Sequence, residues 1–297
     1  MSRRITSAAD TRRFLAARSD AKGAERLAAH LALLVAAGFV LTVSLESWLA
    51  LPAMTAYGVI LIALFAPLHE TLHRTAFRTR RLNDAVAATI GFVHFLPAGH
   101  FRRFHAAHHR HVQDPARDPE LAAPKPATRA AYLWTISTIP YWGSRLRELA
   151  RHAAGRVDAP FIPPAARPMV VREARWHIAG WAAVVALSIA FGWSWPLIYW
   201  LLPTLLGQPF LRLYLMAEHG GCETGPDLRR NTRTVHSNPL VRFLMWNMPY
   251  HIEHHAAPAV PFHVLPAMHE TFDGAPIIHA PGYVTFHRAT WRELTFR

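Results

Sequence analysis

Four long apolar segments constrain this chain more than any other feature. They cover residues 27–45, 48–67, 177–193 and 195–215, and each is long enough to cross about 30 Å of hydrocarbon as a helix. A Glu-Ser break separates the first two segments, and the aromatic turn FGWSWP separates the last two. The pattern predicts an all-α integral membrane protein with four transmembrane helices in two hairpins. A buried hairpin in a soluble protein is the alternative, but spans this long with so few charges are rare in soluble folds.

The charges of the chain lie almost entirely outside these segments. Only Glu46 is charged between Leu27 and Leu68, and no charged residue lies between Trp176 and Leu211, although the chain has a net charge of +13. The arginines gather in the segments that would share one side of a membrane, which is the positive-inside pattern and not that of a nucleic-acid-binding surface. We therefore expect a multi-pass protein of the plasma membrane (the inner membrane of a bacterium), with both termini and the central loop in the cytoplasm.

The rest of the chain divides by composition. Residues 1–26 are polar and basic and lack the apolar core of a signal peptide, so they predict a cytoplasmic N-terminal segment. A single membrane domain is expected over residues 27–297. Within it, residues 84–101 and 131–143 are apolar but interrupted by proline, and they predict interfacial helices. Residues 145–175 are rich in Arg and Pro and predict a polar connector.

Histidines gather in three short clusters, HETLH (69–73), HAAHH (105–109) and HIEHH (251–255). On a helix, residues three or four positions apart share a face, so each cluster can aim two or three imidazoles at one point. All three clusters lie just outside the predicted spans, on the side assigned to the cytoplasm. They predict a His-rich cytoplasmic cap that holds more than one metal ion.

The number of histidines decides between metals. HETLH alone matches the HExxH signature of zinc peptidases, in which two histidines bind Zn²⁺ and the glutamate activates water. A zinc site closes with three or four ligands, so eight clustered histidines are too many for one zinc ion. The single cysteine, Cys222, excludes a Cys-rich metal site. Imidazole also suits iron, and two iron ions with O₂ as co-substrate are the expected cofactors.

The clusters and their surroundings resemble the histidine boxes of the membrane fatty acid desaturase family, whose members are di-iron desaturases and hydroxylases. HETLHRTAF, followed by RRLND, is similar to the first box, and FRRFHAAHHRHVQDPARDPEL is similar to the second. NMPYHIEHHAAPAVPFHVLPAMHE is similar to the third box, and AEHGG resembles the segment that supplies a further histidine ligand before it. The resemblance covers about residues 55–285, most of the chain.

The resemblance implies nine histidines as iron ligands: His69, His73, His105, His108, His109, His219, His251, His254 and His255. Ligating histidines usually donate their second ring N–H to a carboxylate or a carbonyl. The candidate carboxylates are Glu70, Asp118 and Glu253, for which solvated loop charge is an equally open interpretation. Asn231 and Asn247 could hold a water molecule near the site. Structural or surface roles are expected for His94, His100, His111, His236, His263, His269, His279 and His287.

The resemblance also implies an O₂-dependent membrane oxidoreductase, and desaturation of a fatty acyl lipid is the expected reaction. Hydroxylation or ketone formation on a lipid, carotenoid or alkane stays open, because the boxes do not separate these outcomes. Neither a cytochrome-like domain nor a G-x-G-x-x-G nucleotide fingerprint is visible in the sequence. The expected partners are therefore an external electron donor of the ferredoxin type with its reductase, a lipid or acyl-chain substrate and membrane lipids, but no nucleic acid.

Two functions from other classes compete with this reading. An intramembrane zinc protease would need a distant aspartate, for which the sequence FDG offers Asp273, but it would leave six clustered histidines unexplained. A metal transporter would need ionisable groups inside its spans, and these spans are almost bare of them.

Overall fold

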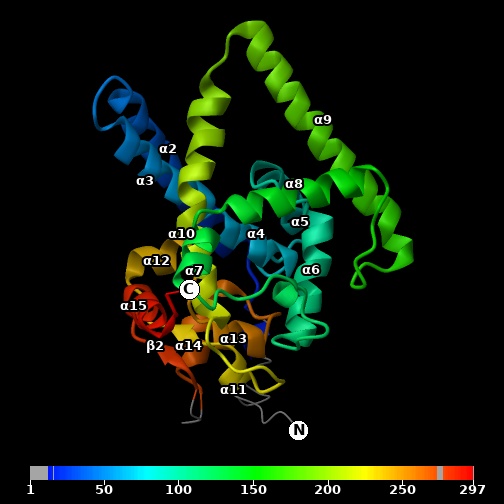
Figure 1. Cartoon of the computed structure of the whole chain (residues 1–297), viewed down its shortest axis with the longest axis vertical. Coiled ribbons are helices and arrows are strands. Elements are labelled where there is room, and N and C mark those ends of the chain that lie inside the picture. Colours follow the sequence, from blue (N-terminus) through cyan, green and yellow to red (C-terminus); the bar gives the residue numbers. More distant parts are fainter. Residues whose placement is uncertain (1–12, 16, 273–276, 297) are drawn as a thin grey trace.

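Helices make up nearly all the regular structure of this chain, and long helices rise from a body of shorter ones (Figure 1). The computed structural model describes residues 13–15, 17–272 and 277–296. Residues 1–12 of the predicted cytoplasmic segment lie outside the described residues. The predicted helical class is confirmed.

Three helical stretches are long and apolar enough to cross a membrane. They are α2 (Asp20–Ser44), the stretch Ala50–Leu72 formed by α3 (Ala50–Ile62) and α4 (Phe65–Leu72), and the stretch Pro164–Phe191 formed by η2 (Pro164–Ala166) and α9 (Arg167–Phe191).

The first of these stretches begins earlier than the predicted span. The hydroxyl of Ser19 accepts a hydrogen bond from the backbone N–H of Lys22 and so caps α2 ahead of residue 27. The carboxylate of Asp20 accepts two further bonds, from the backbone N–H of Thr79 at 2.8 Å and from its hydroxyl at 2.7 Å. The polar end of α2 is therefore fixed to the chain that follows the first histidine box.

The fourth predicted span, residues 195–215, has a different character. It folds as a π-helical turn, η3 (Leu197–Leu201), that leads into α10 (Leu202–His219). Gln208 and Arg212 make α10 less apolar than the three stretches above. A membrane-spanning role for this segment, and with it the arrangement of four spans in two hairpins, stays a prediction.

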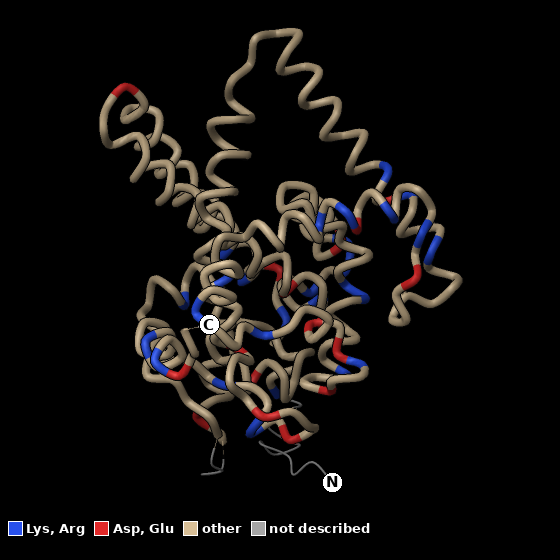
Figure 2. The backbone as a smooth tube through the Cα atoms, in the orientation of Figure 1, with Lys and Arg blue, Asp and Glu red and all other residues tan. Residues whose placement is uncertain are grey.

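The long helices expose apolar side chains over most of their length. Val35 and Phe39 of α2 are 72% and 68% exposed, and Ile189 of α9 is 78% exposed. Figure 2 shows that lysine, arginine and acidic residues concentrate in the body and are almost absent from the projecting helices. A surface of this kind faces lipid in a membrane protein. The chain is therefore a membrane protein whose charged body and apolar helices lie at opposite ends.

α3 and α10 cross at very short range. A Cβ atom added at Gly58 would lie 2.2 Å from the carbonyl oxygen of Pro203, and one added at Gly207 would lie 2.2 Å from the carbonyl oxygen of Gly58. Glycines let two helix backbones approach this closely, as they do in membrane helix pairs. The contact fixes α4, which continues α3, relative to the end of α10.

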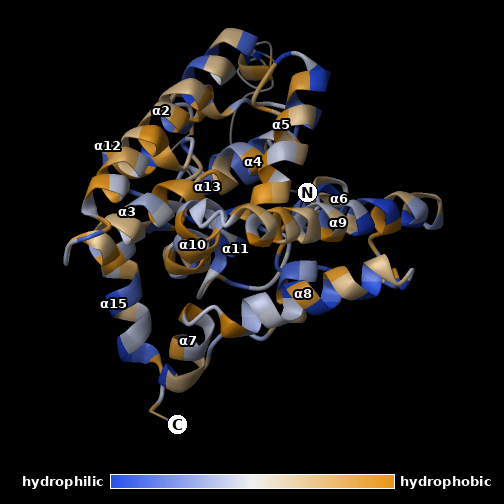
Figure 3. Ribbon diagram, turned by 90° about the horizontal axis from the view of Figure 1, so that it is seen from above, coloured by the Kyte–Doolittle hydropathy of each residue, from blue (hydrophilic) through white to orange (hydrophobic). Residues whose placement is uncertain are grey.

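The body contains shorter helices, which overlap the segments 84–101 and 131–143 that the sequence assigns to the membrane interface. They are α5 (Arg80–Val93), α6 (Ala98–His111), α7 (Arg129–Ile136) and α8 (Ile139–Ala153), with a short turn, η1 (Pro119–Ala122). α8 carries hydrophilic and hydrophobic residues side by side (Figure 3). The prediction of a polar connector over residues 145–175 is wrong for its first and last thirds, because α8 and α9 extend into them.

The C-terminal part folds around the third histidine box. It comprises α11 (Leu228–Asn231), β1 (Thr234–Val235), α12 (Pro239–Leu244), α13 (His251–Ala256), η4 (Phe262–Val264), α14 (Leu265–His269), β2 (His279–Ala280) and α15 (Tyr283–Glu293). The two short strands pair in parallel, with Thr234 opposite His279.

Candidate metal centre

Four helices bring the nine predicted histidine ligands together. His69 lies on α4 and His73 ends that helix, three histidines lie on α6 and three on α13, and His219 is the last residue of α10. Their side chains fall into two adjoining groups. The ring centroids of His109 and His255, one from each group, are 4.2 Å apart. We call the nine together the histidine centre.

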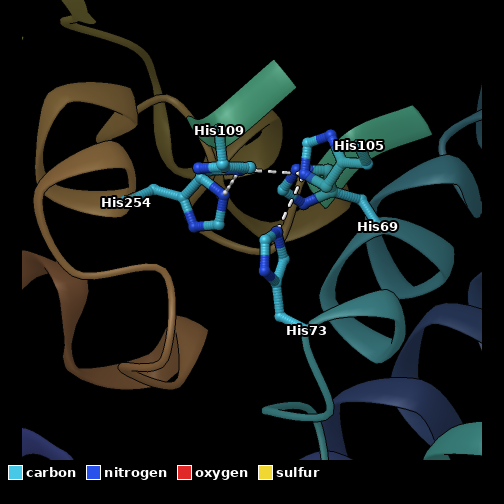
Figure 4. Close-up of side chains that lie close together, drawn as sticks. All are labelled: His69, His73, His105, His109 and His254. Atoms are coloured by element: carbon cyan, nitrogen blue, oxygen red, sulfur yellow. Dashed lines mark hydrogen bonds between the residues drawn. The ribbon is translucent and has the colours of Figure 1, made fainter. Parts of the chain in front are cut away.

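The first group contains His69, His73, His105, His109 and His254, whose ring nitrogens lie within 4.8 Å of one another (Figure 4). Nε2 of His105 is 2.8 Å from Nε2 of His73 and 2.9 Å from Nε2 of His109. Nε2 of His109 is in turn 3.1 Å from Nε2 of His254. The five rings come from all three boxes and face a common point.

The second group contains His108, His219 and His255, whose ring nitrogens also lie within 4.8 Å of one another. Nε2 of His251 is 3.1 Å from Nε2 of both His219 and His255, which places it beside this group. The predicted ninth histidine therefore lies with the box histidines and completes the second group.

The spacing of these nitrogens fits metal ligands better than hydrogen bonds. A ring nitrogen has one proton or one lone pair, yet Nε2 of His105 and of His109 each face two other Nε2 atoms. Metal–nitrogen bonds of about 2.1 Å that meet at a right angle would place neighbouring nitrogens about 3 Å apart. The observed separations agree with that value.

The protonation of the rings also fits metal binding. Burial, reinforced by His69, His109 and His73, lowers the pKa of His105 far below its usual range. Burial acts in the same direction on the pKa of His254. Both rings are therefore neutral at neutral pH, and the neutral imidazole is the form that binds a metal.

Asp118 orients one of these rings. Its carboxylate lies 3.0 Å from Nδ1 of His108 and also accepts a hydrogen bond of 2.8 Å from the backbone N–H of Gln113. Burial alone would lower the pKa of His108, but the carboxylates of Glu120 and Asp118 raise it. With Nδ1 held by Asp118, Nε2 of His108 points into the centre, which is the usual carboxylate–histidine arrangement at a metal.

His219 is oriented by the backbone, which the sequence does not reveal. Nδ1 of His219 lies 3.0 Å from the carbonyl oxygen of Asn231. The carbonyl oxygen of His219 accepts a hydrogen bond of 3.1 Å from the ammonium group of Lys125. The side chain of Asn231 bonds to the carbonyl of Gly225 instead. Asn231 therefore acts near the site through its main chain.

Another contact that the sequence does not reveal joins a histidine of the centre to a carboxylate outside the three boxes. Oε1 of Glu218 lies 3.4 Å from Nδ1 of His251, and Glu218 directly precedes His219. Glu218 is only 7% exposed. Its position one residue before a predicted ligand is the only signal that the sequence offers.

The other two candidate carboxylates are fully buried and not solvated. Glu70 Oε1 accepts a hydrogen bond of 3.0 Å from the backbone N–H of Phe262. Glu253 accepts one of 2.6 Å from the hydroxyl of Thr234 and pairs with Nδ1 of His269. In the described part of the chain, neither carboxylate forms a hydrogen bond to a histidine of the centre. Both join segments around it.

The remaining polar candidates are structural or exposed. The side chain of Asn247 donates to the carbonyl of Phe262 and does not hold the centre. His94 and His100 are buried, and His111 is half-buried. Five more of these histidines remain. His269 pairs with Glu253, His236 and His279 are exposed and stack on each other, and His263 and His287 bond to backbone carbonyls.

Comparison with known proteins identifies the family of this chain. The sequence model of the fatty acid desaturase family matches residues 46–286. The human sphingolipid delta(4)-desaturase/C4-monooxygenase DES2 is 26% identical over 245 residues, which cover 78% of this chain and 70% of the relative. The sphingolipid delta(4)-desaturase DES1 of Drosophila melanogaster is 27% identical over 238 residues, which cover 74% of this chain and 65% of the relative. The match spans four fifths of the sequence and all three histidine boxes, so this chain belongs to the fatty acid desaturase family.

Proposed function

We propose that this chain is an O₂-dependent di-iron membrane oxidoreductase that introduces a C=C bond into the acyl chain of a lipid. The observation that carries the proposal is the convergence of nine buried or half-buried histidines from four helices in two adjoining groups. Two iron ions, when bound, would supply the activation of O₂ that removal of hydrogen from an unactivated C–H bond requires. The chain would hold one iron with the group around His105 and the other with the group around His108.

An apolar cavity supports a lipid substrate. It has a volume of about 830 Å³ and lies between α3, α7, α10, α12 and α15. Ligand sites of this size bury most of a bound molecule and are lined mainly by apolar side chains. Tyr214, in its wall, lies one helical turn before Glu218, which contacts His251 of the centre. An acyl chain in this cavity would run toward the histidines.

The position of the cavity also suggests how the chain would position its substrate. Arg288 and Arg292 of α15 lie in the cavity wall, so an anionic or strongly polar head group would be held there while the apolar chain fills the rest. Exclusion of water by the apolar wall would protect the reacting carbon from side reactions. The proposed substrate is therefore a lipid with one polar end, carried by the membrane.

The second candidate reaction is hydroxylation of the same kind of substrate. The human relative is named as both a desaturase and a C4-monooxygenase, and the family model matches the segment that contains all three boxes of this chain. The zinc-protease interpretation loses support because Glu70 bonds to the backbone of Phe262. Its candidate aspartate, Asp273, lies outside the described residues and does not bear on the choice. We further propose four spans, a cytoplasmic histidine centre and an external electron donor of the ferredoxin type.

The decisive experiment combines metal analysis with lipid profiling. The purified chain should contain about two irons, and a host that expresses it with a working electron donor should accumulate lipids with a new double bond. His73→Ala should abolish the product and lower the iron content, whereas His236→Ala, an exposed histidine outside the centre, should change neither. One zinc ion in place of the two irons would contradict the proposal, and so would product formation by His73→Ala at the wild-type rate. A product that gains oxygen instead of a double bond would select the hydroxylase.

A further inference from the structure

A third group of metal-binding side chains lies outside the histidine centre. It consists of His100 on α6 and of Glu148 and His152 on α8, whose ligand atoms lie within 4.8 Å of one another. Glu148 and His152 are four positions apart and so share one face of α8. His100 and His152 are only 2% and 6% exposed, and polar side chains are seldom buried to this extent.

The distances within this group suit ligands of one ion. Nε2 of His100 lies 3.6 Å from Oε1 of Glu148, which is too long for a hydrogen bond. Two ligands at about 2.1 Å from a tetrahedral metal ion would be about 3.4 Å apart. Adjacent ligands of a six-coordinate ion would be about 3 Å apart, so the separation of His100 and Glu148 is closer to the tetrahedral value. The ring centroids of His100 and His152 are 4.7 Å apart.

The ring of His100 is available as a ligand. Its Nε2 is buried and has no hydrogen-bond partner among the described residues. A buried ring nitrogen without a hydrogen-bond partner can offer its lone pair to a metal ion.

We propose that His100, Glu148 and His152 bind one Zn²⁺ ion, with water as the fourth ligand. Two histidines and one carboxylate form a set that zinc accepts. Arg145 holds the second carboxylate oxygen of Glu148 at 2.5 Å, which orients the first oxygen toward His100. Glu148 is 36% exposed at its side chain, so water can reach the open position.

The ion would join α8 to the helix of the second histidine box. The N-terminal end of α6 already bonds to α9, because Glu173 accepts a hydrogen bond of 2.8 Å from the backbone N–H of Gly99. α8 runs across the same end of α6 (Figure 1). A zinc ion there would fix three helices around the start of α6, and so would have a structural role separate from the histidine centre.

The test measures both metals in the purified, iron-loaded full chain. The protein is equilibrated with Zn²⁺, desalted and analysed for zinc and iron. The wild type should keep one zinc ion beyond its iron, and Zn²⁺ should raise its Tm. Glu148→Gln, which preserves shape, and His152→Ala should each weaken zinc binding about tenfold or more without loss of iron. Arg151→Ala, at an exposed position beside His152 on α8, serves as the matched control and should bind zinc like the wild type.

Three results would overturn this site. The wild type could keep no zinc beyond its iron, Glu148→Gln could keep as much zinc as the wild type, or Glu148→Gln could lose iron instead of zinc. The readouts are independent of the proposed function. Zinc at this site in a chain without lipid product would reject the function and keep the site, whereas product without zinc would reject the site alone.

Discussion

The backbone N–H of Phe262 donates a hydrogen bond of 3.0 Å to the carboxylate of Glu70, across 192 positions of the chain. Glu70 belongs to the first histidine box on α4, and Phe262 begins η4 within the segment that resembles the third box, seven residues after His255. Both residues are buried. Glu70, the glutamate that makes HETLH look like a zinc peptidase motif, therefore joins the segments of two of the three boxes.

We expect Glu70→Gln to keep its iron and to retain activity within a few-fold, because a glutamine oxygen still accepts the bond from Phe262. Glu70→Ala leaves that buried N–H without its partner and should cost about 1–3 kcal/mol of stability. Thermal unfolding in detergent, with iron analysis, measures both effects. A Glu70→Gln protein that holds two irons but makes no product would instead assign Glu70 an acid–base role.

A second prediction concerns Asp118. Asp118→Asn should lower iron affinity about 10–100-fold, because an amide accepts more weakly from Nδ1 of His108 than a carboxylate does. Asp114→Asn is the matched control, since Asp114 pairs with Arg117 at the surface and not with a histidine of the centre. Iron retained after dialysis against a chelator gives the comparison. Equal retention in the two variants would show that Asp118 does not hold its histidine.

The pairing of His269 with Glu253 predicts a pH dependence of stability. The hydrogen bond to Glu253 raises the pKa of His269 above its usual value. The folded chain then holds this proton more tightly than the unfolded chain, whose histidines titrate at about pH 6.5. The stabilisation is complete below that pH and is lost as the pH rises through the higher folded pKa.

Tm of the wild type should therefore fall between about pH 6 and about pH 9, and His269→Gln should show a smaller fall over the same range. Glu253→Gln removes the carboxylate and should flatten the same part of the profile. Parallel profiles for the wild type and His269→Gln would show that the pair does not contribute. Thermal unfolding monitored at several pH values provides the measurement.

The sequence predicted the members of the histidine centre but not their division. From the spacing alone, each box is expected to aim its imidazoles at one point. In the structure, His105 and His109 join the first group while His108 joins the second. Helix geometry explains the split, since neighbouring residues differ by about 100° around the axis and residues four apart by only about 40°. Which face meets which partner depends on the rotation of α6 against α4 and α13, and no local pattern encodes that rotation.

The errors in the fold have a similar origin. The arginines of the stretch RLRELARHA predict a polar connector, but in α8 its charged residues occupy one face of an amphipathic helix. The partners of Glu70 and Glu253 were missed for another reason. They are a backbone amide and a histidine brought close by tertiary packing, and hydrophobic periodicity carries no information about such contacts. Three of the four apolar spans are predictable because length and composition alone decide them.

The crossing of α3 and α10 gives the last prediction. Gly207→Ala places a Cβ atom 2.2 Å from the carbonyl oxygen of Gly58, and neither backbone can move without shifting α4 or His219. The strain should cost about 1–3 kcal/mol and outweigh the gain in helix propensity of about 1 kcal/mol. Gly143→Ala makes the same substitution in α8 where nothing lies within 4 Å, so it should leave Tm unchanged or raise it. Opposite signs for the two variants in a thermal unfolding assay would support the close contact, and a Gly207→Ala protein as stable as Gly143→Ala would contradict it.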